Sequence, residues 1–199
     1  MYTGSKNKMQ IHNAIVVRAT DYKESDRLLR LFTYDAGIIT AVIKGVKNPK
    51  AKLKFAGGLF SFCEYSLTEK GGFYSVVGAS PIESLFAITQ NPDMFKLACV
   101  MLEVSDVVVG SASAPSLFIE LLKAFKGMLY DRQKPYFVAA DYITKCLEFG
   151  GYSGRPMTFA PTAGTLEIAG PTDNKAALYK ACYAIEKHFD VKLKAFTVL

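Results

Sequence analysis

Five short runs of β-branched and apolar residues fall within the first 80 residues of the chain. They cover residues 11–19, 29–33, 38–44, 59–68 and 73–79, with turns at 35–37 and 69–72 and one long interruption after the third run. Such runs between turn residues are typical of strands. Five short strands with one long interruption predict a small Greek-key barrel of the OB-fold type. From the strand count alone, an SH3-like barrel fits nearly as well.

Beyond residue 80 the pattern changes to prolines followed by apolar residues at helical spacing. The segment Ser80-Pro81-Ile82-Glu83 has the form of a capping box, so we expect a helix to begin there. Further helices are expected from 92 to about 109, from 115, from 135 to the glycines at 150–151, and from about 174 to 188. Residues 151–173 hold four Gly and three Pro and predict an irregular loop. The sequence thus predicts an α+β chain with an OB-fold domain over 1–80 and a helical bundle domain over 81–199.

The positive charge of the chain is concentrated in its first part. Residues 1–80 hold 12 Lys and Arg against 6 Asp and Glu, whereas residues 81–199 hold 12 of each. The excess is greatest in residues 44–54, called here the lysine loop, which contains no acid and has the lysines Lys44, Lys47, Lys50, Lys52 and Lys54. An uncompensated cluster of this kind favours a polyanionic partner, although a solvated surface turn is the ordinary alternative.

Other side chains near the predicted barrel loops extend this candidate site. Arg18, Lys23 and Arg27 lie near the end of the first strand and are candidates to contact phosphates. Tyr22 and Phe55 are candidates to stack on bases if their rings point outward. Phe73 and Tyr74 are adjacent on a strand and must face opposite sides, so one of them belongs to the core.

Residues 14–50 carry a family likeness in the order of their motifs. The motifs are AIVVR (14–18), DYKESDRLL (21–29), LFT (31–33) and VIKGVKNPK (42–50). This string resembles the N-terminal domain of the bacterial recombination mediator RecO, and residues 191–199 are similar to the C-terminus of that family. The resemblance implies an OB-fold followed by a helical domain. It also implies single- and double-stranded DNA binding, annealing of complementary strands, and cytoplasmic, nucleoid-associated action with RecR and single-strand-binding protein to help RecA load.

The cysteines bear on a metal site that many relatives have. Cys63, Cys99, Cys146 and Cys182 are never closer than 36 residues, which suits neither a disulfide framework nor a zinc ribbon, so we expect reduced, buried thiols. Many members of the resembled family carry a four-cysteine zinc site in the loop before the last helix. Here Gly151–Asp173 contains no Cys and no His, so we expect no zinc and no other cofactor.

Three further interpretations remain open from the sequence. Asp21, Glu24 and Asp26 suit a metal-dependent hydrolase on paper, but charged residues in a turn more commonly pair with one another, and no Walker sequence or partnered His supports an enzyme. A generic RNA-binding barrel is the second alternative. In the helical part a basic cluster is a candidate dock for the acidic tail of single-strand-binding protein, as the resemblance implies, or an ordinary basic helix end. Its members are Lys123, Lys126, Arg132 and Lys134.

Overall fold

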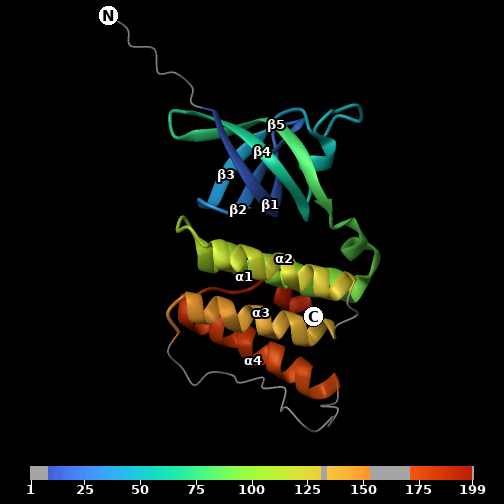
Figure 1. Cartoon of the computed structure of the whole chain (residues 1–199), viewed down its shortest axis with the longest axis vertical. Helices are drawn as coiled ribbons and strands as arrows, with labels where there is room; N and C mark the ends of the chain where they lie inside the picture. Colours follow the sequence, from blue (N-terminus) through green and yellow to red (C-terminus); the bar gives the residue numbers. More distant parts are fainter. Residues whose placement is uncertain (1–8, 131–133, 153–170, 199) are drawn as a thin grey trace, which may run out of the picture. The chain divides into compact units, whose positions relative to one another are not determined.

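The computed structural model describes residues 9–130, 134–152 and 171–198. Its five strands close into a barrel (Figure 1) in the order β1-β2-β3-β5-β4. They are β1 (Met9–Tyr22), β2 (Asp26–Thr33), β3 (Gly37–Ile43), β4 (Ser61–Lys70) and β5 (Phe73–Ser84). β3 and β5 pair in parallel, the other neighbours pair antiparallel, and β1 closes the barrel against β4. This order is that of the OB-fold, so the OB-fold prediction is confirmed and the SH3-like alternative is wrong.

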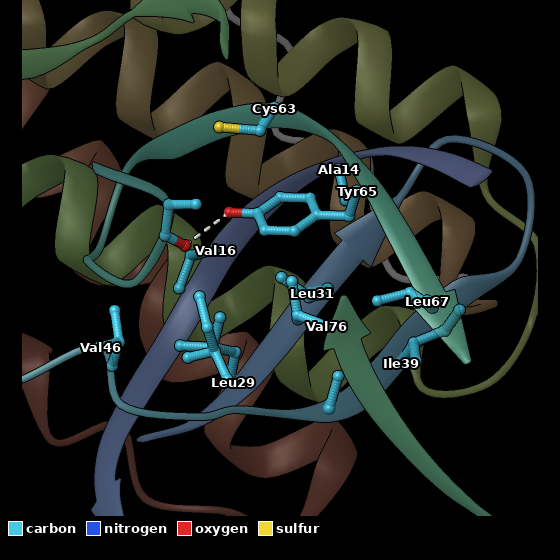
Figure 2. Close-up of a cluster of buried hydrophobic side chains, with 13 residues drawn as sticks. Ala14, Val16, Leu29, Leu31, Ile39, Val46, Cys63, Tyr65, Leu67 and Val76 are labelled. Carbon is cyan, nitrogen blue, oxygen red and sulfur yellow. Dashed lines mark hydrogen bonds between the residues drawn. The ribbon is translucent and has the colours of Figure 1, made fainter. Parts of the chain in front are cut away.

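Alternate residues of each strand fill the barrel interior, as the period of two requires. Leu29 and Leu31 on β2 and Tyr65 and Leu67 on β4 have no exposed surface. Figure 2 shows the Tyr65 ring among these side chains, with its hydroxyl donating to the backbone oxygen of Ala56 at 2.8 Å. Ala56 ends the short 3-10 helix η1 (Lys54–Ala56), so the barrel core holds the end of the lysine loop in place.

The helical prediction is confirmed for four segments. The helices are α1 (Pro92–Val109), α2 (Pro115–Leu129), α3 (Pro135–Phe149) and α4 (Pro171–Phe189), with short 3-10 turns η2 (Phe86–Gln90) and η3 (Ala195–Val198). Asn91 caps α1, because its side-chain oxygen accepts the backbone N–H of Asp93 and of Met94, each at 3.1 Å. α3 and α4 pack side by side (Figure 1). Most of the predicted loop at 151–173 lies outside the described residues, and α4 begins at Pro171 rather than at 174.

The helix predicted to begin at Ser80 is wrong, because β5 continues to Ser84. Ser80 pairs with Glu64 and Pro81 with Cys63 in the ladder with β4. The register of that ladder shifts between Phe62 and Cys63, and such an irregularity tolerates a proline, which has no N–H to give to a neighbour. Pairing along β4 therefore overrides the local capping signal.

The chain divides into two compact units, and the predicted boundary at residue 80 falls inside β5. One unit comprises residues 1–86 together with 109–115, and the other comprises 87–108 and 116–199. Within the first unit, the Ile38 N–H donates to the Gly110 oxygen at 2.7 Å, and a Cβ at Gly37 would collide with the Ala112 oxygen. Whether 1–80 and 81–199 fold as separate domains stays a prediction.

The four cysteines are free thiols, as expected. Cys63, Cys146 and Cys182 are buried, whereas Cys99 is only partly so. Burial raises the pKa of Cys146 and of Cys182 to about 12, and burial together with the carboxylate of Glu103 raises that of Cys99 to about 11. All of these groups are therefore neutral thiols at neutral pH, which is the unreactive form.

Candidate nucleic-acid interface

The lysine loop connects β3 to η1 and has internal backbone order. Successive turns are closed by hydrogen bonds from Asn48 to Gly45, from Ala51 to Asn48 and from Lys54 to Ala51, at 3.1, 3.0 and 3.2 Å. Val46 is buried in the barrel core, whereas all five lysines of the loop are exposed. The loop is therefore an ordered surface segment that points its charges into solvent.

The turn between β1 and β2 holds the lysine loop at its first residues. A carboxylate oxygen of Asp26 accepts the Gly45 N–H at 2.8 Å, and the backbone oxygen of Ser25 accepts the Lys47 N–H at 3.0 Å. Both bonds join segments about 20 residues apart in sequence. The turn and the loop thus form one structure, although the sequence shows them as two separate motifs.

Asp21 and Arg27 complete this connection with charged groups. Asp21 accepts from Arg27 Nε at 3.1 Å and from Lys47 Nζ at 2.8 Å, and these two bonds lower the pKa of its carboxyl group. Arg27 also donates to the backbone oxygen of Gly57 at 2.9 Å, at the far end of the loop. Arg27 and Lys47 therefore already serve the shape of the site.

The cluster of lysines in the loop is not wholly uncompensated. The lysine loop contains no acid, but Asp21 supplies a counter-ion to Lys47 from another segment. Within the ranges that the structure describes, the other four lysines have no ion-pair partner; these are Lys44, Lys50, Lys52 and Lys54. They are the cations of the loop that remain available to an anionic ligand.

The aromatic candidates lie at the rims of the same loops. Tyr22 is 42% exposed and Phe55 is 46% exposed, so both rings point outward as their proposed role requires. Lys23, at a left-handed φ of 53°, places its Nζ 5.3 Å from the centroid of the Tyr22 ring. At the β4–β5 hairpin, Phe73 is 78% exposed whereas Tyr74 packs against the core. Phe73 is therefore a third candidate for base stacking, which the sequence could not choose over its neighbour.

Arg18, which was predicted to extend the site, lies on the outer surface of β1. Arg18 on β1 is exposed and stands opposite Arg30 on β2, and Arg30 in turn stands opposite Thr40 on β3. Arg30 could not be recognised as a candidate from the sequence, because only the register of β1 on β2 brings it beside Arg18. Strands 2 and 3 form the face on which OB-folds bind oligonucleotides.

Two of the three carboxylates considered for catalysis, Asp21 and Asp26, serve the turn instead. Asp21 pairs with Arg27 and Lys47, and Asp26 accepts from Gly45 and from the Ser25 hydroxyl at 3.3 Å. Charged residues beside this turn do pair with one another, since Arg27 pairs with Asp21. Among the described residues, no group of three or more His, Cys, Asp or Glu side chains is arranged to hold a metal ion.

The basic cluster on the helical unit is partly neutralised. Lys123 pairs with Glu120 at 2.8 Å, and Glu120 and Asp141 both pair with Lys145 at 2.7 Å. These groups line a pocket of about 180 Å³ between α2 and α3, in which two lysines stand beside two carboxylates. Lys126 and Lys134 are exposed, and Arg132 lies outside the described residues.

The length and hydropathy of the helices bear on whether any of them could cross a membrane. In the part of the chain that the structure describes, none of them combines the length and the apolar character that a membrane span requires.

The strand order and the loops together define the first unit as an OB-fold barrel with a basic, aromatic-rimmed loop surface. More particularly, residues 9–85 match the family described as Recombination protein O N terminal, which confirms the resemblance noted from residues 14–50. The barrel domain therefore belongs to the RecO family.

Curated relatives support this assignment over most of the chain. A DNA repair protein RecO from Desulfitobacterium hafniense is 31% identical over 167 residues, covering 76% of this chain and 60% of that protein. Proteins of the same name from Caldicellulosiruptor saccharolyticus and Dehalococcoides mccartyi are 28% and 29% identical, covering 69% and 70% of this chain and 57% and 55% of theirs. The chain therefore spans somewhat over half the length of the curated relatives that it matches.

Proposed function

We propose that this chain is a non-enzymatic DNA-binding recombination mediator of bacterial DNA repair. In this proposal it binds single- and double-stranded DNA and anneals complementary strands in the cytoplasm, in association with the nucleoid. Its partners are RecR and the acidic tail of single-strand-binding protein, and its action helps RecA to load. The names of its relatives and the family of its barrel support a role in DNA repair. The basic, aromatic-rimmed loop surface supports the binding of nucleic acid.

The observation that carries the proposal is the ordered lysine loop on the OB-fold barrel. Four of its lysines have no ion-pair partner within the described ranges, and Tyr22 and Phe55 stand exposed beside them. Lysine ammonium groups bind phosphates without sequence preference, and exposed rings stack on any base. Neutralising the phosphates of one strand lowers its repulsion toward a second strand. Complementary strands can then pair without nucleotide hydrolysis.

An annealing assay tests this proposal directly. Two complementary oligonucleotides with a donor and an acceptor dye are mixed with the whole protein, and energy transfer reports pairing. We expect faster pairing with wild-type protein, and a loss of this effect when the four lysines without partners are replaced by Gln. Failure of the wild-type protein to accelerate pairing would refute the proposal. A strong preference for RNA strands over DNA strands would instead support the RNA-binding alternative.

A further inference from the structure

Helix α4 presents lysines and tyrosines along one exposed line. Lys175, Tyr179, Tyr183 and Lys187 follow one another at intervals of four residues, and residues four apart lie on the same side of a helix. Tyr179 is 37% exposed and Tyr183 is 59% exposed, and both lysines are exposed. We call these four residues the tyrosine–lysine stripe.

The stripe lies in a basic part of an otherwise acidic region. Residues 174–199 hold five lysines against two acids, whereas residues 81–173 hold seven basic residues against ten acids. One of the two acids, Glu186, is engaged, because its Oε1 accepts the Leu193 N–H at 2.9 Å. Lys180, Lys192 and Lys194 are exposed as well. Residues 174–199 are therefore basic, which the neutral total of residues 81–199 conceals.

Each tyrosine of the stripe carries a lysine over its ring. Lys175 Nζ lies 5.7 Å from the centroid of Tyr179, and Lys187 Nζ lies 5.4 Å from that of Tyr183. An exposed cation–π contact is weaker than the stacking of a base on an aromatic ring. A base can therefore displace the ammonium group from the ring, and the displaced group is then close enough to bind the phosphate of that nucleotide.

The backbone around the stripe is held in place on its inner side. Leu178, Ala181 and Ile185 of α4 are buried. Phe196 packs edge-on against Tyr179, with ring centroids 5.0 Å apart. The segment carrying Phe196 is fastened to α1, because the carboxylate of Glu103 accepts the N–H of Lys194 at 3.0 Å and of Ala195 at 2.7 Å. A rigid platform of this kind loses little conformational entropy when it binds a ligand.

We propose that the tyrosine–lysine stripe binds a single nucleic-acid strand, as a second site in addition to the lysine loop. The two rings are about 6 Å apart along the helix, which suits successive bases of an extended strand. A membrane-surface helix would instead present a broad apolar face with Trp, Phe or Leu. The inference extends the proposed function and rests on it in one respect: one chain with two strand sites can hold both strands that are to be annealed.

The test uses the full chain and variants that separate rings from charges. Tyr179→Leu with Tyr183→Leu removes the stacking rings and keeps the charge, whereas Lys175→Gln with Lys187→Gln keeps the rings. Tyr130→Leu is the control, because Tyr130 is 61% exposed on the same unit but lies outside the stripe. Thymine and uracil 30-mers carrying 5-iodouracil are photo-crosslinked to each protein, and the crosslinked peptides are identified by mass spectrometry.

We expect crosslinks to Tyr179 and Tyr183 as well as to the lysine loop, with the comparison of thymine and uracil strands showing whether the stripe prefers DNA. In a background with the lysine loop changed to Gln, the double Tyr variant should lose about tenfold or more in affinity for the 30-mer. The same variant should lose its preference for a thymine tract over an abasic tract. The Tyr130 control should match its parent in each measurement.

Three outcomes separate the two proposals. Crosslinks confined to the lysine loop, with unchanged affinity of the double Tyr variant, would overturn the second site and leave the proposed function standing. Crosslinks confined to α4, with a lysine-loop variant that binds like wild type, would support the stripe and refute the loop. Binding of the stripe to anionic phospholipid vesicles without any crosslink to a 30-mer would assign it to a membrane surface and overturn the inference.

Discussion

The salt dependence of single-strand binding distinguishes the lysines that bind phosphate from those that shape the site. Each phosphate neutralised on a single strand contributes about −0.7 to the slope of log K against log salt. Five independent loop lysines would contribute about −3.5, whereas the four without partners contribute about −2.8. A rise from ~50 to ~200 mM salt then weakens the loop contribution about 50-fold for four contacts and about 130-fold for five.

Two variants separate Lys47 from the other four lysines of the loop. Replacing Lys44, Lys50, Lys52 and Lys54 together by Gln should flatten the slope by about 2.8. Replacing Lys47 alone by Gln should change the slope by much less than 0.7, because that ammonium group is bound to Asp21 at 2.8 Å. Slopes are measured by fluorescence anisotropy of a labelled thymine 30-mer over the same salt range. Comparing variants with wild type removes any contribution from other parts of the chain.

A matched control changes the same kind of charge elsewhere. Lys123, Lys126 and Lys134 are exposed lysines on the helical unit, and their replacement by Gln should leave the slope unchanged. Circular dichroism should show the same melting temperature for the fourfold variant as for wild type, since its side chains make no ion pairs within the described ranges. A fourfold variant that keeps a slope within 0.7 of wild type would show that these lysines do not contact phosphates and would place the DNA path away from the loop.

Four further predictions concern stability. Tyr65→Phe should cost about 1–3 kcal/mol in urea unfolding, because the buried oxygen of Ala56 loses its donor. Gly37→Ala should lower the melting temperature more than a surface Gly→Ala change, since φ is 69° and the new Cβ would meet the Ala112 oxygen. The pKa of Asp21 is lowered from an ordinary 3.8 by its two cationic partners, Lys47 and Arg27. This pairing therefore stabilises the fold above about pH 4, and the stabilisation is lost as the pH falls through the lowered pKa. Asp21→Asn should make the melting temperature less sensitive to acid in that pH range. Chelators should leave the melting temperature unchanged and elemental analysis should find no stoichiometric zinc, because the loop before the last helix has neither Cys nor His.

The fold was predictable from the sequence wherever one local signal acted alone. Alternating apolar runs located the five strands, and prolines at 92, 115 and 135 marked the first residues of three helices. The error at Ser80 arose where two signals competed. A capping box is a local pattern, whereas the pairing of Ser80 with Glu64 depends on a strand 16 positions earlier in the chain. The capping pattern alone could not show which of the two would prevail.

The site was less predictable, because its contacts join distant segments. The sequence located the cationic loop, but the counter-ion of Lys47 comes from Asp21, 26 positions away. The neighbour of Arg18 became visible only with the strand register. The tyrosine–lysine stripe was not recognised from the net charge of residues 81–199. The acidic residues before residue 174 cancel the lysines that follow it. The first two features depend on contacts in space, whereas the four-residue spacing of the stripe is visible in the sequence once residues 174–199 are taken by themselves.

The contacts of Asp21, Asp26 and Arg27 also explain what the motifs of residues 14–50 encode. These three side chains hold Gly45, Lys47 and Gly57, so the motif at residues 21–29 fixes the loop that begins within the motif at residues 42–50. The residues that make the sequence resemble its family therefore fix the shape of the loop. The four lysines without an ion-pair partner in the described ranges are those available to bind phosphate. It follows that a change at Asp26 should weaken DNA binding by disordering the loop while leaving the number of phosphate contacts, and hence the salt slope, nearly intact. Hydrogen exchange of the loop amides would show the disorder, and a steep loss of slope in Asp26→Ala would contradict this division of roles.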